Sequence, residues 1–251
     1  IKVISFNNQG ICNYCLEIDK IRKEFSTGKI QGKKKLDLII HKVKKEGKKK
    51  KYDCIVGVSG GVDSSYLIDF VVKKGLRPLA VHYDNTWNSS IATDNISRVL
   101  KKLKVDLYTH VVDNEEIDDI HKSFFLSGLP DIDAATDLGL AETLYRAAKK
   151  FNIKYVFEGH SFITEGISSI GDNYHDGRYI REVHKRYGKI KMKTYPLMTL
   201  TSFLKWTLFF RIKKVRPFWY VKYSKEEARE YLKKKFDWSY YGGHHLENKI
   251  S

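Results

Sequence analysis

The sequence predicts an α/β fold in which helices cover both faces of a parallel sheet. Short apolar segments of strand length alternate with segments whose apolar residues recur at helical spacing, which is typical of βαβ units. Connections of this length favour right-handed crossovers between parallel strands. The predicted strands are 54–58, Leu79–Tyr83, Leu107–Val112 and Tyr155–Glu158, and the helical patterns between them are 65–74, 91–103 and 137–151.

The segments that flank this core have different patterns. Residues 17–30 are helical and charged, and a second helix with one apolar face is predicted from residue 32 to Gly47. After residue 160 the alternation stops, and residues 161–190, rich in Gly, Ser, Asp and His, are predicted to form a long active-site loop.

Residues 200–223 mix basic and aromatic side chains, and Ser224 is placed to N-cap a last helix. The mixed stretch suits base stacking, a membrane surface, or a covering helix and strand with solvated lysines. We therefore expect a small Cys-x-x-Cys knuckle with helices at 1–50, the α/β domain at 51–200, and a helical, aromatic–basic extension at 201–251.

Composition sets the broad class of the protein. The chain has 251 residues, of which 42% are hydrophobic, so it can bury a core. A formal net charge of +16 suits an anionic partner, such as a nucleic acid, a nucleotide, a sugar nucleotide or a membrane surface. Three cysteines do not suggest a disulfide scaffold.

The sequence shows no signal peptide and no transmembrane run of about 18 apolar residues, which predicts a soluble cytoplasmic protein. It begins at Ile1 rather than Met, which suggests a fragment.

The most specific motif is Ser-Gly-Gly-Val-Asp-Ser at residues 59–64, between a buried strand and a helix. Adjacent glycines let the backbone adopt positive φ and approach a ligand closely. The helix presents unpaired N–H groups and its positive dipole end to the loop, and Ser59, Ser64 and Ser65 add hydroxyl donors. The sequence therefore predicts an anion site of phosphate type, the alternative being a plain βα turn with a serine cap.

Polar residues follow each predicted strand where it ends. Because the carboxyl ends of parallel strands meet at one edge of a sheet, we expect these four pairs to converge on one crevice. Lysines and arginines within 178–193 are expected to neutralise phosphate charge there. The pairs are Ser59-Gly60, Asp84-Asn85, Asp113-Asn114 and Gly159-His160.

Two groups of residues suggest metals. Asp63 lies inside the loop and is the better candidate for Mg²⁺, whereas Asp131, Asp133 and Asp137 either bind Mg²⁺ or substrate or cap the following helix. Cys12 and Cys15 form half of a tetrahedral Zn²⁺ site, and Cys54 enters a buried strand. Either the remaining ligands lie outside the chain, or histidines such as His244 and His245 supply them, or no zinc binds.

The loop has neither the Lys-Ser/Thr of a Walker motif nor the Gly-x-Gly-x-x-Gly of dinucleotide folds, and it resembles the PP-loop of ATP pyrophosphatases. These Rossmann-like enzymes, of the adenine nucleotide alpha hydrolase-like fold, cleave ATP between its α and β phosphates and transfer AMP to a substrate oxygen. The resemblance makes 51–200 the PP-loop domain, with adenine read by backbone groups of the second strand and a Gly-His pair near the phosphates. It implies that ATP contacts Ser59, Gly60, Gly61, Val62, Asp63, Ser64, Val81, His82, Tyr83, Asp84 and Gly159, with catalytic roles for Ser59, Asp63, Ser64 and His160.

Further motifs in the same order make the whole chain resemble the N-acetyl sugar amidotransferases of lipopolysaccharide O-antigen and flagellin-glycan biosynthesis. Members of that family usually carry another Cys-x-x-Cys upstream of the first and continue past the Tyr-Gly-Gly element. The motifs are Gln9–Cys15, Tyr52–Ser64, Val81–Asn88, Glu158–His160 and Trp238–Asn248.

This resemblance implies an ATP-dependent reaction with Mg²⁺. The N-acetyl carbonyl oxygen of a UDP-sugar attacks the α-phosphate, and ammonia then displaces AMP to leave an acetamidino group. Ammonia comes from a glutaminase subunit and a cyclase-like channel subunit, resembling those of imidazole-glycerol-phosphate synthase, and no nucleic acid is expected as partner. The implied substrate residues are Asn85, Trp87, Asn88, Asp133 and His244.

Two other functions compete with this interpretation. A tRNA-modifying PP-loop ligase or thiolase is favoured by the net charge of +16. It is disfavoured because thiolation needs a sulfur-carrying cysteine near the crevice, and none is evident. A non-catalytic nucleotide-binding module is the second alternative.

Overall fold

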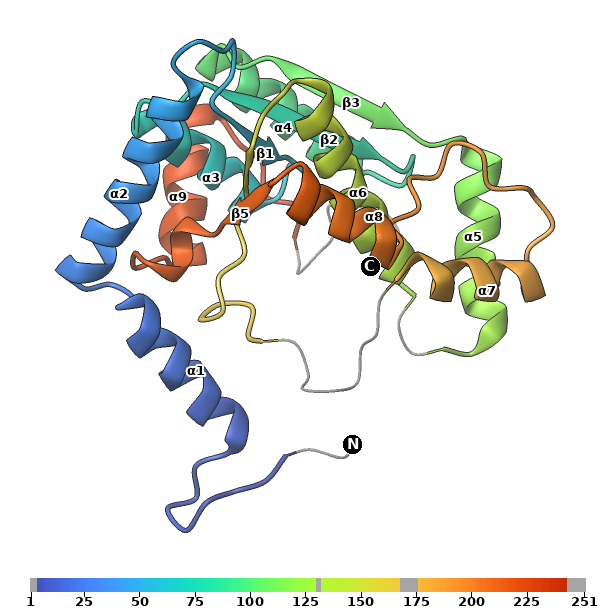
Figure 1. The fold of residues 1–251 in the computed structure, drawn as a ribbon, viewed down its shortest axis with the longest axis horizontal. Helices are drawn as coiled ribbons and strands as arrows, with labels where there is room; N and C mark the ends of the chain where they lie inside the picture. Colours follow the sequence, from blue (N-terminus) through green and yellow to red (C-terminus); the bar gives the residue numbers. More distant parts are fainter. Residues whose placement is uncertain (1–3, 130–131, 168–175, 243–251) are drawn as a thin grey trace.

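A five-stranded parallel sheet forms the centre of the molecule, as the computed structural model shows for residues 4–129, 132–167 and 176–242 (Figure 1). The strand order is β3-β2-β1-β4-β5, and every neighbouring pair is parallel. The predicted α/β class is confirmed. The strands are β1 (Cys54–Gly57), β2 (Pro78–Asp84), β3 (Leu107–Val111), β4 (Tyr155–Phe157) and β5 (Lys213–Val215).

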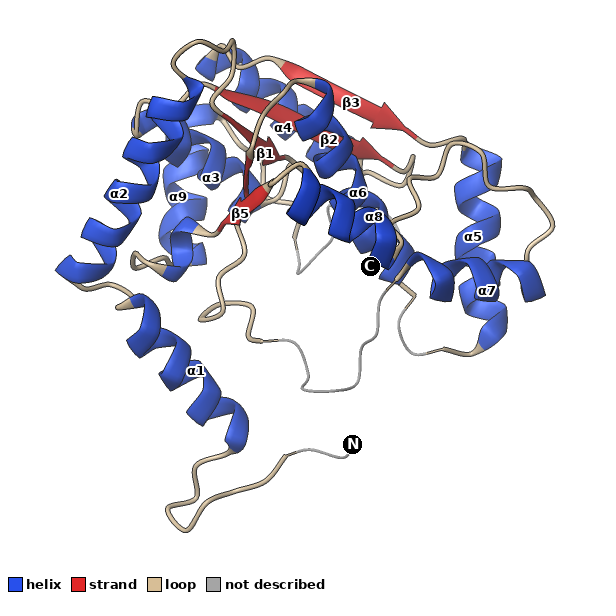
Figure 2. Ribbon diagram, in the orientation of Figure 1, coloured by secondary structure: helices blue, strands red, loops and turns tan. Residues whose placement is uncertain are grey.

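Helices cover both faces of this sheet (Figure 2). Side chains of α2, α3, α4 and α9 pack on one face, while α6 and the segment around Trp206 pack on the other. The helices are α1 (Asn13–Phe25), α2 (Ile30–Gly47), α3 (Val62–Lys73), α4 (Ser90–Leu103), α5 (Asn114–Ser127), α6 (Ala134–Lys150), α7 (Gly177–Tyr187), α8 (Leu200–Leu204) and α9 (Lys225–Phe236), with a π-helical turn η1 (Lys205–Phe209) and a 3₁₀ turn η2 (Pro217–Trp219).

Strand β1 is buried from both sides, which explains its uninterrupted apolar sequence. Successive side chains of a strand point to opposite faces of the sheet. Cys54 and Val56 belong to the cluster under α2 and α3, whereas Ile55 belongs to the cluster under α6. All three side chains are fully buried.

The direction of strand addition reverses at β1. From β1 the chain adds β2 and β3 on one side, and then crosses to add β4 and β5 on the other. In open α/β sheets such a reversal separates the two loops that follow the adjacent strands, and the resulting crevice is where ligands bind. Here it lies between the carboxyl ends of β1 and β4.

The region after β3 differs from the prediction. No helix was expected between residues 112 and 137, yet α5 fills most of it. Asp113 caps this helix by accepting a hydrogen bond from the backbone N–H of Glu116 at 3.1 Å. Asp113 is therefore a helix cap, and it does not line the cleft at the ends of β1 and β4.

The predicted long loop at 161–190 is also wrong in part, because α7 occupies 11 of its residues. Asp176 caps α7, and the buried residues Ile180, Val183 and His184 recur at helical spacing. That spacing was a usable signal, masked by the polar composition of the surrounding segment.

Two carboxylates of α5 hold α7 and the chain that follows it. Glu116 accepts backbone hydrogen bonds from Lys193, Thr194 and Tyr195 at 2.8–3.1 Å. Asp119 accepts from the backbone of Lys189 and Ile190 and pairs with His184 at 3.0 Å. Basic residues of this segment are thereby fixed beside α5.

The aromatic–basic stretch adopts the helix and strand that the sequence left as one alternative. Its strand, β5, extends the sheet at the edge next to β4. Val215, Phe218 and Tyr223 are buried in the same cluster as β1. Within 4–129, 132–167 and 176–242, no helix combines the length and apolar character needed to cross a bilayer.

Candidate functional site

A cleft of about 500 Å³ opens at the point where the strand order reverses. It lies over the carboxyl ends of β1 and β4 and is walled by α6 on one side and β5 on the other. Its lining residues are Gly57, Val58, Ser59, Asp63, Ser64, Asp137, Leu140, Ala141, Leu144, Phe157, Glu158, Gly159, His160, Glu165, Lys214 and Arg216.

The Ser59–Ser64 loop has the conformation expected of an anion site. Gly60 has φ of +82°, and Gly61 is the N-cap of α3 with no side-chain hydrogen bond. The first N–H groups of α3 therefore have neither an intrahelical acceptor nor a capping side chain, and they suit an anion. The hydroxyls of Ser59 and Ser64 lie 3.2 Å apart at the mouth of the loop.

Trp238 and Ser239, near the end of the described residues, help to hold this loop in place together with Asn95 of α4. The carbonyl oxygen of Gly60 accepts hydrogen bonds from Trp238 Nε1 at 3.1 Å and Asn95 Nδ2 at 3.3 Å. Asn95 in turn bonds the backbone of Ser239 through both ends of its amide, at 2.8 and 2.9 Å. Trp238 was implicated by resemblance alone, and the structure gives it a positioning role.

We expect Trp238→Phe to lower the free energy of unfolding by about 2 kcal/mol, because it deletes a buried hydrogen bond and leaves a small void. Trp87→Phe is the matched control, since its Nε1 bonds the exposed Asp118 at 2.7 Å. That variant should cost about 0.5 kcal/mol. Urea denaturation of both proteins measures the difference, and equal losses would remove the proposed support of the loop.

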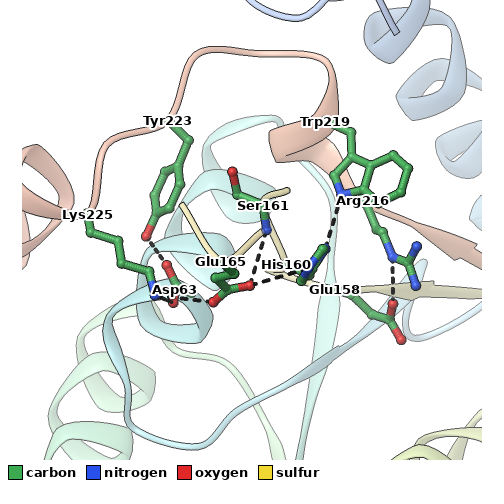
Figure 3. A network of polar contacts seen from close by, with 9 residues as sticks. All are labelled: Asp63, Glu158, His160, Ser161, Glu165, Arg216, Trp219, Tyr223 and Lys225. Carbon is green, nitrogen blue, oxygen red and sulfur yellow. Dashed lines mark hydrogen bonds and ion pairs between the residues drawn. The ribbon is translucent and has the colours of Figure 1, made fainter. Parts of the chain in front are cut away.

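An acid–lysine group borders the loop (Figure 3). Asp63 accepts a hydrogen bond from the hydroxyl of Tyr223 and pairs with Lys225 Nζ at 3.2 Å. The same Nζ lies 3.2 Å from Glu165 Oε1, so one cation serves two carboxylates. Burial raises the pKa of Asp63, against the opposing effects of Tyr223 and Lys225.

His160 extends the group toward β5. Its Nδ1 accepts a hydrogen bond from Trp219 Nε1 at 3.3 Å, and its Nε2 lies 3.8 Å from Glu165 Oε2. Burial lowers the pKa of His160, and the positive charge of Arg216 acts in the same direction. The imidazole is therefore neutral at neutral pH, which fits Nδ1 as an acceptor.

Lys214 and Arg216 supply the positive charge on the far wall of the cleft. They bond Glu158 at 2.6 Å and 3.0 Å. Burial disfavours the ionised carboxylate, but the two cations outweigh it and hold the pKa of Glu158 below its usual range.

None of the residues 178–193, which were expected to neutralise phosphate charge, lines the cleft, so that role stays a prediction. Glu116 and Asp119 hold that segment beside α5 instead. Lys214 lies in β5 and Arg216 directly follows the last residue of that strand, and both side chains line the cleft.

The ends of β1 and β4 meet as expected. A Cβ added to Gly159 would lie 3.1 Å from the carbonyl carbon of Asp63, so the residue after β4 packs directly on the loop. Gly159 and His160 line the cleft with Ser59, Asp63 and Ser64.

The residues predicted to read adenine lie along β2, outside the lining of the cleft. The carbonyl oxygens of Val81 and Asp84 accept sheet hydrogen bonds from Val58 and Val112. His82 and Tyr83 are buried, and His82 Nδ1 lies 2.8 Å from the Val58 carbonyl oxygen. Their contact with ATP, like that of Gly61 and Val62, remains a prediction.

The predicted substrate residues lie mainly in the turn after β2. Asn85 Nδ2 reaches Thr136 near the start of α6, and Asn88 bonds Asp84 at 3.2 Å. Asp133 occupies the N-cap position of α6, but its side chain makes no capping hydrogen bond. Asn85, Trp87, Asn88 and Asp133 do not line the cleft, and His244 and Asp131 fall outside the described residues.

Asp63 and Glu165 are suited to hold Mg²⁺. Both are carboxylates, the oxygen ligands that Mg²⁺ prefers, and Lys225 between them shows that the pair accommodates a cation. Glu165 was not predicted, because a single glutamate in a polar segment carries no motif.

The Cys12–Cys15 pair lies apart from the cleft at the start of α1. The two sulfur atoms are 3.3 Å apart, and Cys12 Sγ accepts from the backbone of Cys15. Across the described ranges, no group of three or more His, Cys, Asp or Glu side chains forms a metal site, so this pair gains no third ligand there. Cys54 is fully buried, as predicted.

No family model and no curated protein matches this chain. Among solved structures, it is similar to the U34-tRNA thiolase of Methanococcus maripaludis, at 14% identity and a TM-score of 0.46 over 84% of this chain and 67% of that one. It is also similar to the NMN synthetase of Francisella tularensis, at 17% identity and a TM-score of 0.38 over 87% and 96%. It is similar as well to the NH3-dependent NAD synthetase of Campylobacter jejuni, at 16% identity and a TM-score of 0.38, over 61% of this chain and 72% of that one. Likeness at this level assigns no reaction to this chain.

Proposed function

We propose that this protein is a cytoplasmic, ATP-dependent C–N ligase that releases AMP and pyrophosphate. The observation that carries the proposal is the pairing, in one cleft, of an uncapped helix N-terminus with an acid–lysine group on its rim. The first suits a polyphosphate and the second suits its metal ion. Lys214 and Arg216 on the opposite wall are suited to the charge of a transferring phosphoryl group.

The proposed acceptor is the N-acetyl group of a UDP-sugar of surface polysaccharide biosynthesis, for which the sequence motifs are the support. An amide oxygen is a very poor leaving group, so it needs activation before ammonia can replace it. The carbonyl oxygen attacks the α-phosphate of ATP, the α–β bond breaks, and pyrophosphate leaves. Ammonia then adds to the imidate carbon and AMP departs with the former amide oxygen, leaving an acetamidino group.

We assign separate roles in this reaction to the residues that line the cleft. The loop donors of Ser59, Gly61 and Ser64 bind the leaving pyrophosphate, and Asp63 with Glu165 would hold Mg²⁺. When bound, that ion would neutralise charge on the phosphates. Neutral His160 accepts from Trp219 through Nδ1, so its Nε2 carries the ring proton and is suited to donate a hydrogen bond to a phosphate oxygen.

Ammonia is proposed to come from separate glutaminase and cyclase-like channel subunits. No cysteine of the described ranges lines the cleft, so no thiol nucleophile is at hand to release ammonia from glutamine there. The same fact counts against a thiolase, which needs a sulfur carrier near the reacting atoms.

The proposal is tested by measuring AMP formation with Mg-ATP and ammonia across a panel of UDP-N-acetyl sugars, with tRNA as the comparator. We expect AMP to form with at least one sugar nucleotide and not with tRNA alone. AMP formation stimulated only by tRNA would favour a tRNA ligase. Binding of ATP without AMP from any acceptor would favour a nucleotide-binding module.

We expect Lys225→Met to move the acid limb of Mg-ATP affinity to higher pH. The charge of Lys225 lowers the pKa of Asp63, so its removal raises that pKa, and Asp63 becomes protonated at a higher pH as acid is added. Lys225→Arg keeps the charge and should keep the wild-type profile. Titrations from pH 4.5 to 8 give the comparison, and coincident profiles for Met and wild type would show that Lys225 does not control Asp63.

A further inference from the structure

A second cavity, of about 350 Å³, lies on the other side of the wall made by Lys214 and Arg216. Both side chains line this cavity and the cleft described above. Its remaining walls include Phe25 at the end of α1, Ile39 of α2, and Trp219 and Tyr220 at the end of η2. We call it the aromatic pocket. Its volume is within the range of small-molecule sites.

The aromatic pocket is built by contacts between segments far apart in the sequence. Phe25 packs edge-on against Trp219 and Tyr220, with ring centroids 4.9 Å and 5.1 Å apart. The turn after α1 is tied to η2, because the Thr27 hydroxyl donates to the Trp219 carbonyl and the Gly28 N–H donates to the Tyr220 carbonyl at 3.0 Å. The rings are thus held in place from both sides.

Charge and aromatic surface meet at Trp219. The guanidinium carbon of Arg216 lies 4.9 Å from the centre of the Trp219 ring. The Nε1 of Trp219 donates a hydrogen bond to His160, which lines the cleft (Figure 3). Trp219 therefore lines the aromatic pocket and bonds a residue that lines the cleft. A ligand with a flat ring and an adjacent anionic group matches this combination, because bases stack on aromatic side chains and guanidinium groups pair with phosphates.

We propose that the aromatic pocket binds a nucleoside diphosphate, with the base against Phe25 and Trp219 and the phosphates against Lys214 and Arg216. In the reaction proposed above, on which this role rests, it is the nucleotide end of the acceptor. The sugar beyond the diphosphate then extends past Lys214 and Arg216 into the cleft. The hydrogen bond between Trp219 and His160 links the aromatic pocket to the cleft.

UDP is the probe, and calorimetric titration is the measurement. Phe25→Leu removes the ring but keeps an apolar contact with Trp219, and Phe25→Tyr keeps the ring as its matched control. We expect Phe25→Leu to weaken UDP binding at least about tenfold, and Phe25→Tyr to stay within about threefold of wild type. ATP affinity should be the same in all three proteins, and thermal melting checks that each is folded.

Titrations with uridine and with pyrophosphate divide the ligand into its parts. Both should bind more weakly than UDP, because each uses only one half of the pocket. UDP should also bind protein saturated with α,β-methylene ATP, since Phe25 and Trp219, which hold its base, line the aromatic pocket and not the cleft. Competition between the two ligands, equal weakening of UDP and ATP by Phe25→Leu, or no UDP binding with or without the ATP analogue would overturn the proposal.

This test separates the pocket from the proposed reaction. Selective UDP binding without AMP from any sugar nucleotide would leave the pocket standing and remove the reaction. AMP formation by Phe25→Leu with an unchanged KM for the UDP-sugar would support the reaction and overturn the proposed role of the pocket.

Discussion

Replacing Asp63 by asparagine is expected to lower AMP formation by at least about 100-fold. The carboxylate lies at the rim of the loop, bonded by Tyr223 and Lys225, and is one of the two groups suited to Mg²⁺. Asparagine keeps the shape and an oxygen acceptor but loses the charge. The fold should therefore survive while metal binding fails. Steady-state AMP release at saturating Mg²⁺ gives the measurement.

Asp37→Asn is a matched control for this change. Asp37 pairs with Lys74 at 2.8 Å on the surface between α2 and α3, away from the cleft lining. Its loss should leave AMP formation within about twofold, since surface ion pairs contribute little. Turnover by Asp63→Asn close to that of the control would show that the phosphate site is misplaced.

Gly60→Ala is expected to lower the free energy of unfolding by about 3 kcal/mol and to abolish measurable ATP binding. The residue has φ of +82°, and an added Cβ would lie 2.7 Å from the carbonyl carbon of Ala92 and nearer still to its oxygen. The loop would have to move away from α4. That movement would also break the bonds from Trp238 and Asn95 that hold the Gly60 carbonyl.

Gly128 separates the two causes of this loss. It has φ of +66°, but an added Cβ would meet nothing within 4 Å. Gly128→Ala should therefore cost about 1 kcal/mol from backbone conformation alone. Chemical denaturation of both variants measures the difference, which reports the clash at Gly60. Equal losses would mean that the loop adapts to the extra methyl group.

The parallel sheet and the loop after its first strand could be predicted because their signals are local. An apolar strand, two glycines and a helical pattern follow one another within Cys54–Val71, and the structure confirms each step. The meeting of Ser59 with His160 required only the rule for strand order in parallel sheets.

The acid–lysine group could not be predicted, because it depends on contacts across long sequence separations. Tyr223 and Lys225 reach Asp63 from 160 or more positions away, and nothing in their local sequence marks them. The aromatic pocket could not be predicted for the same reason. Phe25 and Trp219 carry no motif, and they meet only because the turn after α1 is hydrogen-bonded to η2. Helix α5 was missed for another reason, since Asp113-Asn114 was taken for a polar strand end and the residues after it were given no element.

An oxygen-18 tracer tests the central claim most directly. A UDP-sugar labelled with oxygen-18 in its N-acetyl carbonyl group is incubated with the protein, Mg-ATP and ammonia. Mass spectrometry then measures the label in AMP and in pyrophosphate. If the amide oxygen attacks the α-phosphate, AMP carries one labelled oxygen and pyrophosphate carries none. Unlabelled AMP, or ADP and phosphate as the products, would contradict adenylation of the amide in this cleft.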